Sequence, residues 1–175
     1  MIPRTSTNLR NRVNKLYLPR TKALYPLFEL ISNSIHAIQE VKENSTNGQV
    51  GRINIDLLRI VSVEALEQVE SLDAYPVDSF VVYDNGIGLN DSNFTSFMEF
   101  DSEKKAEIGG KGVGRLVCLK AFRELHVESV YRNYEKELKI RRFKYKRTKT
   151  GFEDYEENIE TNISATQTRV ELKGL

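Results

Sequence analysis

The stretch Glu29–Ala37, which reads ELISNSIHA, constrains the fold of this chain more than any other. At 100° per residue, the apolar positions around it gather on one side of a helix and the polar positions on the other. The apolar side holds Leu27, Phe28, Leu30, Ile31, Ile35, Ile38 and Val41, and the polar side holds Glu29, Ser32, Asn33, His36 and Glu40. Glu29 and Asn33 stand one turn apart, so a carboxylate and a carboxamide project side by side. We expect an amphipathic helix over residues 21–43, with Thr21 as its N-cap and Pro26 near its first turn.

Length and composition limit the class of protein. The 175 residues suffice for one domain with its own core, and a net charge of +1 implies no general attraction to nucleic acid or membrane. The single cysteine, Cys118, stands in the apolar run 116–119, so we expect a buried structural thiol. No apolar run reaches the roughly 18 residues of a membrane span, and residues 1–18 lack the apolar centre of a secretory signal. We therefore expect a cytoplasmic protein that does not engage membranes.

Helical patterns precede most of the strand patterns. Beyond residues 21–43, we expect helices at 93–99 and 115–122, and strands at 52–58, 80–83, 125–131, 137–147, 158–163 and 168–172. Residues 44–48 read as a loop and 101–107 as a charged, mobile segment. Residues 61–79 are ambiguous, and Val63–Leu72 within them could be a short helix or an insertion. This order favours an α+β two-layer sandwich, with helices on one face of a mixed, mostly antiparallel sheet.

The domain boundaries follow from the same patterns. Residues 1–20 are polar and basic, and we expect an N-terminal arm that is irregular or a short helix ending at Pro19. Residues 21–175 would form the folded domain. The sequence stops directly after an expected strand, which is abrupt for a domain, so we expect the N-terminal part of a longer protein.

A glycine-punctuated loop follows the buried strand at 80–83. Asp84-Asn85-Gly86 alone is ordinary turn chemistry, but a second glycine, Gly88, comes two residues later. The pair of glycines suggests that the backbone approaches a flat ligand closely. Asp84, at the end of the strand, could accept a charge-assisted hydrogen bond from an exocyclic amine of that ligand.

A second glycine-rich turn, Ile108–Leu116, leads into an apolar helix. Glycines at 109, 110, 112 and 114 leave backbone N–H groups free beside a helix N-terminus, an arrangement suited to phosphate. The turn differs from a Walker A loop, because Gly112 follows Lys111 where that loop carries serine or threonine. A flexible linker is the simpler interpretation, but the helix that follows directly argues against it.

The basic run at 132–149 admits two interpretations. It holds nine lysines or arginines with interleaved aromatics, and the acidic stretch 153–160 follows it closely. A hairpin could pair these opposite charges across its strands, or the basic strands could line a nucleic-acid groove. We favour the hairpin, because the acidic partner is so near in sequence.

Taken together, the three polar stretches resemble the GHKL superfamily of ATP-binding domains, which includes gyrase B subunits, ninety-kilodalton heat-shock chaperones, histidine kinases, MutL and MORC proteins. Glu29–Ala37 is similar to the first box, E-L-x-x-N-S-x-D-A, Asp84–Gly88 to the second, D-x-G-x-G, and Ile108–Gly114 to the third, I-G-x-x-G-x-G. Thr168–Leu172 is similar to the closing strand, and Phe100–Lys104 resembles the segment before the third box in MORC and MutL. The likeness spans residues 24–172 and implies the Bergerat fold.

The resemblance implies a role for each matched residue. Glu29 would be the general base that activates water, and Asn33 would hold Mg²⁺ together with phosphate oxygens and waters. Asp84 would bind the adenine amino group, with Thr168 near the base. The remaining nucleotide-binding residues would be Ala37, Gly86, Ile87 and Gly88 around the base, and Gly109, Gly110, Lys111, Gly112, Val113, Gly114 and Arg115 in a lid over the phosphates.

Two positions depart from the family pattern. His36 stands where the family usually has aspartate, which changes the local hydrogen-bond network but not the Mg²⁺ ligand. Arg115 follows the last glycine, where chaperones often carry an aromatic residue. It could add charge near the phosphates or simply face solvent.

The resemblance implies an Mg²⁺-dependent ATPase that acts as a switch in a larger machine. ATP would close the lid and favour a homodimer, hydrolysis would reset it, and a downstream domain of the same chain would supply a lysine to the γ-phosphate. The isolated piece would then hydrolyse ATP slowly. One alternative is a nucleotide-gated module without turnover, which could clamp nucleic acid through strands 132–149. Another is a phosphotransferase of the kinase type, which Glu29 argues against.

Overall fold

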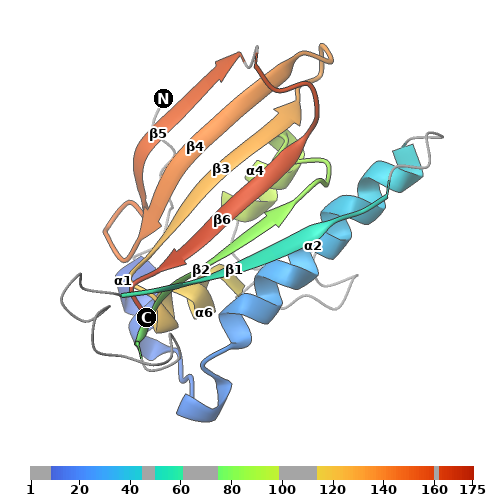
Figure 1. The fold of residues 1–175 in the computed structure, drawn as a ribbon. Helices are drawn as coiled ribbons and strands as arrows, with labels where there is room; N and C mark the ends of the chain where they lie inside the picture. Colours follow the sequence, from blue (N-terminus) through green and yellow to red (C-terminus); the bar gives the residue numbers. More distant parts are fainter. Residues whose placement is uncertain (1–8, 45–49, 61–74, 99–113, 160–161) are drawn as a thin grey trace.

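The protein is built on one sheet with helices packed against it (Figure 1). The structure is a computed structural model that describes residues 9–44, 50–60, 75–98, 114–159 and 162–175. Its helices are α1 (Leu9–Lys15), the 3₁₀ turn η1 (Arg20–Lys22), α2 (Tyr25–Asn44), α4 (Asp91–Met98) and α6 (Gly114–Ala121). Its strands are β1 (Ile53–Arg59), β2 (Val77–Asp84), β3 (Glu124–Arg132), β4 (Leu138–Lys146), β5 (Phe152–Ile159) and β6 (Gln167–Lys173).

The sheet order brings distant parts of the sequence together. Its six strands run in the order β1-β2-β6-β3-β4-β5, and every strand pair in the described residues is antiparallel. The last strand, β6, therefore lies between β2 and β3. In this register Thr168 pairs with Asp84 on one side and with Ser129 on the other. The position expected near the adenine thus lies beside the acid expected to bind it.

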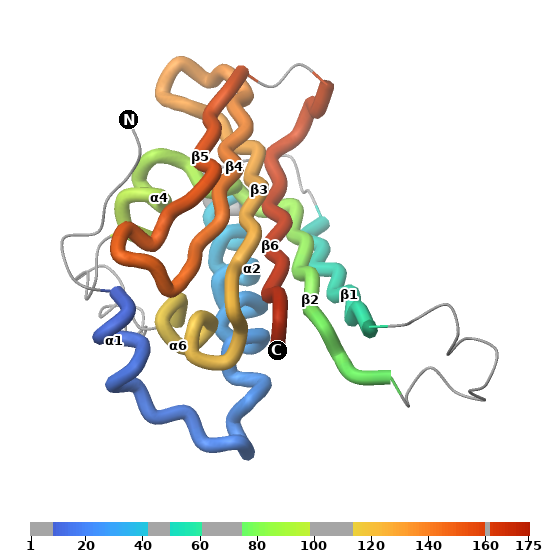
Figure 2. The backbone as a smooth tube through the Cα atoms, turned by 90° about the vertical axis from the view of Figure 1, so that its left-hand side faces the viewer, coloured from blue at the N-terminus to red at the C-terminus, as the bar shows by residue number. Residues whose placement is uncertain are grey.

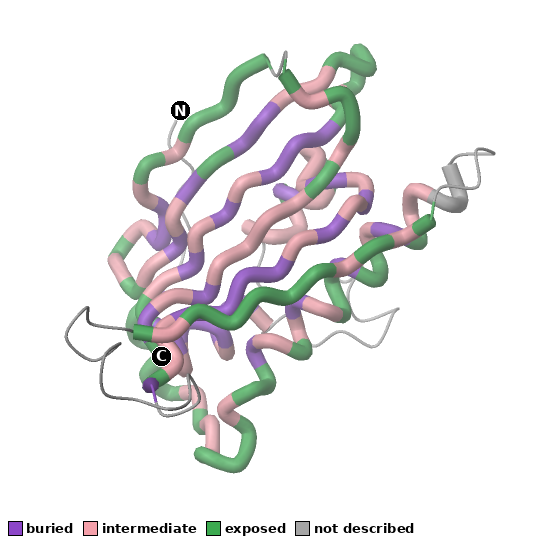
Figure 3. Tube along the Cα trace, viewed as in Figure 1, coloured by how far each residue is buried: buried purple, intermediate pink, exposed green. Residues whose placement is uncertain are grey.

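The helices and the sheet form two layers (Figures 1 and 2). Helix α2 contacts β1, β2 and β6 and packs against α6, and α6 contacts α1. Between the layers lies a core that includes Leu30, Phe80, Val82, Leu116, Leu119, Leu125, Val127, Phe143 and Leu172. Figure 3 shows burial concentrated in the inner strands and exposure along the edge strand β1. The expected α+β two-layer sandwich is confirmed.

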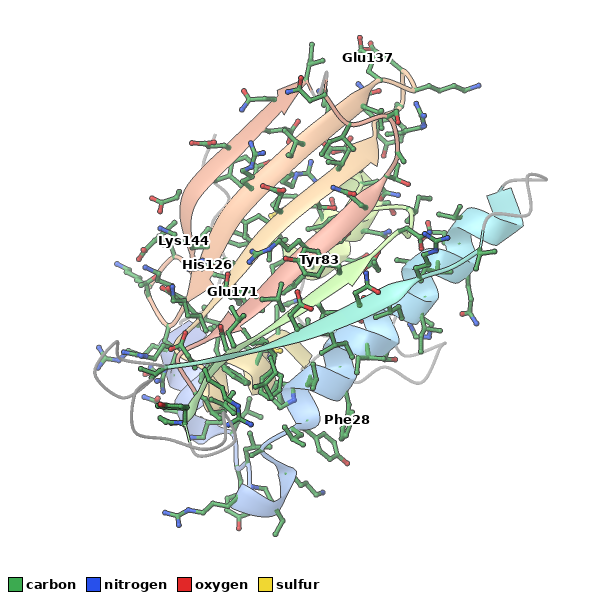
Figure 4. The ribbon with its side chains drawn as sticks, viewed as in Figure 1. Phe28, Tyr83, His126, Glu137, Lys144 and Glu171 are labelled. Carbon is green, nitrogen blue, oxygen red and sulfur yellow. The ribbon has the colours of Figure 1, made fainter. Side chains whose placement is uncertain are left out.

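The face of the sheet away from the helices carries charged side chains (Figure 4). Glu171, His126 and Lys144 stand in register on β6, β3 and β4. The His126 ring nitrogen Nε2 lies 2.7 Å from Oε1 of Glu124 on the same strand. His126 therefore belongs to this outer charged face and not to the ligand pocket described below.

The hairpin of β4 and β5 pairs opposite charges, as the sequence predicted. Lys144 Nζ lies 2.6 Å from a carboxylate oxygen of Asp154, and Lys146 Nζ lies 2.8 Å from one of Glu153. The ammonium group of Lys144 holds the pKa of Asp154 below its usual range. The carboxylates of β5 thus neutralise much of the basic strand β4, and the hairpin interpretation is confirmed.

The boundaries expected at Thr21 and at 158–163 were wrong. Thr21 lies in η1 and α2 begins only at Tyr25, because a helix begun at Thr21 would need an N–H from Pro26, which has none. The strand expected at 158–163 runs from 152 to 159 instead. It begins there because Gly151, at φ +80°, completes the turn that lets β5 pair with β4.

Some of the remaining expectations concern buried helical residues, and others fall on segments outside the described residues. Cys118 is buried as expected, and Leu9 and Val13 of α1 belong to the core although they come from the N-terminal arm. Most of the loop 44–48, residues 61–74 of the ambiguous stretch 61–79, the charged segment 101–107 and residues 108–113 lie outside the described residues. The end of the ambiguous stretch belongs to β2, which begins at Val77 and not at 80 as expected. Across the described helices, none combines the length and apolarity of a membrane span.

The burial of α1 gives a stability test. Leu9 is 0% exposed, so Leu9→Ala should lower the free energy of unfolding by about 2–5 kcal/mol through lost burial and a residual cavity. Tyr17 is 87% exposed, and Tyr17→Ala should change the stability by less than about 0.5 kcal/mol. Urea denaturation of both variants checks this. Equal stability of Leu9→Ala and the wild type would mean that α1 does not contribute to the core.

Candidate functional site

A pocket of about 450 Å³ lies between α2, α4 and the inner face of the sheet. One wall is apolar, from Leu30, Val82, Leu89, Phe97, Leu125, Val127 and Val170, and the polar lining residues are Asn33, Ser34, His36, Glu40, Asp84, Ser92, Asn93, Ser96 and Thr168. An apolar cavity with a few converging polar groups suits a flat, partly polar ligand. The first and second boxes and Thr168 of the closing strand all contribute to it.

Asp84 is the buried acid of this pocket. It ends β2 and is 8% exposed. Its Oδ2 accepts a hydrogen bond from Ser34 Oγ at 2.8 Å, and its Oδ1 accepts one from the backbone N–H of Gly86 at 2.9 Å. Burial raises the pKa of Asp84, and these two hydrogen bonds oppose that rise. Since an ionised carboxylate offers about four acceptor sites, Asp84 keeps capacity for a ligand N–H donor.

The loop after Asp84 docks directly on α2. The N–H of Ile87 donates to the carbonyl of Ala37 at 3.0 Å. A Cβ at Gly86 would lie 2.6 Å from the Cβ of Ala37, so this close approach requires glycine. Gly88 has φ +81° and also packs tightly against the backbone carbonyl of Val130. Ala37 and Gly88 line the pocket, whereas Gly86 and Ile87 hold the loop against the helix.

Thr168 reaches the pocket from β6 and is held by a second hydroxyl. Ser129 Oγ lies 3.0 Å from Thr168 Oγ1 and donates toward the carbonyl of Gln167 at 3.2 Å. The same oxygen accepts the N–H of Leu89 at 2.7 Å. Ser129 is 0% exposed, so the strand beside Thr168 and the loop after Gly88 share one buried hydrogen-bonding centre.

The exposed polar side chains of α2 form the mouth of the pocket. Asn33, His36 and Glu40 follow one another along one face of the helix, and Glu40 Oε2 accepts a hydrogen bond from Asn93 Nδ2 at 3.2 Å. Within the described ranges, no group of three or more His, Cys, Asp or Glu residues could hold a metal ion. A magnesium ion at Asn33 would therefore need oxygens from its ligand and from water, which is how Mg²⁺ is commonly bound.

Glu29 stands at the other end of this helix face, outside the residues that line the pocket. A Cβ built on Gly114 would lie 2.5 Å from Oε2 of Glu29, so the carboxylate rests against the first residue of α6. The first box and the last glycine of the third box therefore meet in space. The other expected lid residues, Gly109, Gly110, Lys111, Gly112 and Val113, lie outside the described residues.

Arg115 points into the core. It is 7% exposed, and its guanidinium carbon lies 5.4 Å from the centre of the Phe97 ring. The alternative that Arg115 faces solvent is therefore wrong. Burial raises the pKa of Tyr145 to about 12, and the positive charge of Arg115 opposes that rise. The side chain lies next to the pocket wall formed by Phe97, not among the residues that line the pocket.

Sequence reasoning missed two hydroxyl groups of this site. Ser34 orients Asp84, and Ser129 links Thr168 to Leu89. Each had a signal in the sequence. Ser34 falls four residues after Leu30 and four before Ile38, on the apolar side of the helix, and Ser129 alternates with the core residue Val127 on the inner face of β3. A lone hydroxyl on a buried face needs a partner, and here the partners are site residues.

Comparisons with known proteins agree with this geometry. The profile of the family described as "Histidine kinase-, DNA gyrase B-, and HSP90-like ATPase" matches residues 26–171. In structure, the chain is similar to the ATPase region of Saccharomyces cerevisiae topoisomerase II, with a TM-score of 0.54 and 14% sequence identity. That likeness covers 87% of this chain and 38% of the topoisomerase chain, and at this identity it supports the fold alone. No curated protein sequence matches the chain.

The raised pKa of Asp84 gives a pH test. The carboxylate takes up a proton at a higher pH than an exposed aspartate does, and the protonated acid is a poorer acceptor for an amine. Affinity for adenosine, which has no phosphate to titrate, should therefore be full above this raised pKa and should fall as the pH decreases through it. Calorimetric titrations across pH check this, and Asp56→Asn, on the edge strand β1, should follow the wild-type profile. An affinity that stays constant into the range where exposed carboxylates titrate would contradict the role of Asp84.

Proposed function

The chain belongs to the family of histidine kinase-, DNA gyrase B- and HSP90-like ATPases, and from this premise we propose that it hydrolyses ATP with Mg²⁺ as the nucleotide-driven switch of a larger protein. Family membership supports ATP binding in the pocket between α2 and the sheet. The observation that carries the proposal is the buried Asp84 on the pocket floor, already oriented by Ser34 and Gly86. Such an acceptor is suited to the exocyclic amine of adenine.

Different pocket residues would bind different parts of the nucleotide. Asp84 would accept the adenine amino group, Thr168 would lie beside the base, and the apolar wall would cover its ring faces. Asn33, at the pocket mouth, would hold Mg²⁺ together with phosphate oxygens and water. The ion would supply neutralisation of the charge that develops on the phosphates. His36 lies one turn from Asn33 on the same side of the helix, and it would leave the carboxamide oxygen of Asn33 in place as the metal ligand.

Glu29 would orient and activate the water that attacks the γ-phosphate. Its carboxylate lies against Gly114, where the glycine-rich turn ends and α6 begins. Free N–H groups at the start of a helix favour phosphate, so the γ-phosphate and Glu29 would meet at this point. By the resemblance, histidine kinases usually lack this glutamate, so Glu29 favours transfer to water over transfer to a protein side chain.

The switch would depend on parts beyond these residues. Closure of the expected lid residues 109–113 over the phosphates would favour a homodimer, and a downstream domain would complete the site with a lysine. The isolated chain would then hydrolyse ATP slowly. The protein would work in a reducing cytosol. Charge pairing within the β4–β5 hairpin leaves fewer free cations there, which weakens the alternative of a nucleic-acid clamp.

Glu29→Ala tests the proposed hydrolysis. The variant should bind ATP as the wild type does, while phosphate release should fall about 100-fold or more, because the general base is lost. Calorimetry measures the binding, and a phosphate sensor measures the release. Glu156→Ala, which changes an exposed carboxylate on β5, serves as the control and should leave both unchanged. Wild-type binding without any phosphate release would favour the non-hydrolysing module, and full turnover by Glu29→Ala would remove Glu29 from the mechanism.

Asp84→Asn tests the adenine site. An amide in place of the carboxylate weakens the charge-assisted hydrogen bond, so affinity for adenine nucleotides should fall about 10- to 100-fold. The control is Asp56→Asn, which makes the same chemical change at an exposed position. Unchanged affinity of Asp84→Asn in a calorimetric titration would refute the assignment.

A further inference from the structure

Arg141, on the basic strand β4, is buried although the adjacent arginine, Arg142, is exposed. It is 2% exposed, whereas the side chain of the adjacent Arg142 is 44% exposed and pairs with Glu128 on the open face of the sheet. The guanidinium carbon of Arg141 lies 4.1 Å from the centre of the Phe94 ring and 4.5 Å from that of Tyr131. Two aromatic rings therefore pack against the guanidinium. Such a position is costly for a charge unless its edge is fully hydrogen-bonded.

The edge of the guanidinium meets two carboxylates and a phenol. Its Nη2 lies 2.7 Å from Oδ1 of Asp91, 2.9 Å from Oε2 of Glu157 and 2.8 Å from the hydroxyl of Tyr131. We call these four residues the Arg141 cluster. It joins α4, which begins at Asp91, to strands β3, β4 and β5.

The other terminal nitrogen of the guanidinium, Nη1, binds backbone carbonyl groups. Nη1 of Arg141 donates to the carbonyl of Leu89 at 2.7 Å and toward that of Asn90 at 3.4 Å. The N–H of Leu89 is bound on its other side by Ser129 Oγ at 2.7 Å. Both backbone polar groups of Leu89 are thus held by side chains of the inner sheet face. A connecting segment that water would otherwise solvate becomes a fixed part of the sheet.

The segment held in this way forms part of the pocket wall. Leu89 lines the pocket, and so do Ser92, Asn93 and Phe97 of α4, the helix whose first residue is bonded to Arg141. Gly88 and Asp84, just before the segment, belong to the same wall and floor. No side chain of the basic run at 132–149 lines the pocket, but Arg141 holds residues that do.

We propose that Arg141 is a positioning residue for nucleotide binding, which fixes Leu89 and the start of α4 so that the base end of the pocket is formed before the ligand arrives. This inference rests on the proposed function, because it assigns Arg141 to the same nucleotide pocket. Preorganisation raises affinity by removing the cost of ordering the wall on binding. Lysine cannot replace this guanidinium, because a single ammonium group does not match the planar set of carbonyls and carboxylates.

Arg141→Met tests the proposal. Methionine keeps most of the volume of the arginine beside the two rings. The side chains of Asp91 and Glu157 are already 39% and 28% accessible, so water can solvate these carboxylates once the guanidinium is gone. The dissociation constants of adenosine and of Mg-ATP should both rise about tenfold, by a similar factor, because Leu89 and the start of α4 would lie beside the base that both ligands carry. Calorimetry at a temperature where circular dichroism shows every variant folded gives both constants.

Two controls separate positioning from stability and from charge. Leu9→Ala lowers the stability from a core site outside the pocket lining, and Arg142→Met removes a neighbouring positive charge from the same strand. Both should keep wild-type affinity for adenosine. In the nucleotide-free protein, the backbone amide resonances of Leu89 and Asn90 should shift in Arg141→Met and stay in place in both controls, which reports the lost contact to the Leu89 carbonyl. The affinity for adenosine then separates positioning from stability.

The outcomes distinguish the proposals from each other. Wild-type affinity in Arg141→Met, together with a lower melting temperature, would make Arg141 a stabiliser of the hairpin and overturn the positioning role alone. A loss confined to Mg-ATP would overturn it as well. If the wild type binds neither adenosine nor Mg-ATP, the proposed function fails and this inference fails with it. If Arg141→Met does not fold, Arg141→Lys takes its place, and the same rise in both constants is expected.

Discussion

The site depends on one contact between layers, where α2 meets the end of β2. Ser34 on the buried side of the helix donates to Asp84 on the strand, and the carbonyl of Ala37 accepts the N–H of Ile87 from the loop that follows. These two hydrogen bonds fix the helix at one distance and one rotation above the sheet. With that rotation set, Asn33, His36 and Glu40 lie at the pocket mouth and Glu29 lies against α6.

Two buried charged side chains near the pocket, Asp84 and Arg141, differ in how their hydrogen bonds are satisfied. Asp84 is held by two donors and keeps acceptor capacity, so a ligand amine can complete its hydrogen bonding. Arg141 has its donors directed at carbonyls, carboxylates and a phenol, and its guanidinium packs against two aromatic rings. The first arrangement suits ligand binding, and the second suits a fixed wall.

Much of the fold and of the site could be predicted from sequence because the signals are local. The helix around Glu29, the buried strand before Asp84 and the charge-paired hairpin each follow from periodicity or from charges close in sequence. The errors have local causes too. Pro26 prevented a start at Thr21, and Gly151 placed β5 earlier than its apolar residues suggested. Ser129 and Arg141 were missed as site residues because their partners lie about 40 and 50 residues away.

The sequence by itself determined the three glycine- and acid-bearing boxes, the order of helices and strands, and hence the family and the two-layer fold. Periodicity and loop chemistry are properties of neighbouring residues, so they can be read along the chain. Only the tertiary structure decided which buried polar groups meet. The insertion of β6 between β2 and β3 placed Thr168 beside Asp84 and Ser129, and the rotation of α6 turned Arg115 into the core. Those pairings depend on strand order and helix rotation, which the packing of the whole core selects and no short stretch encodes.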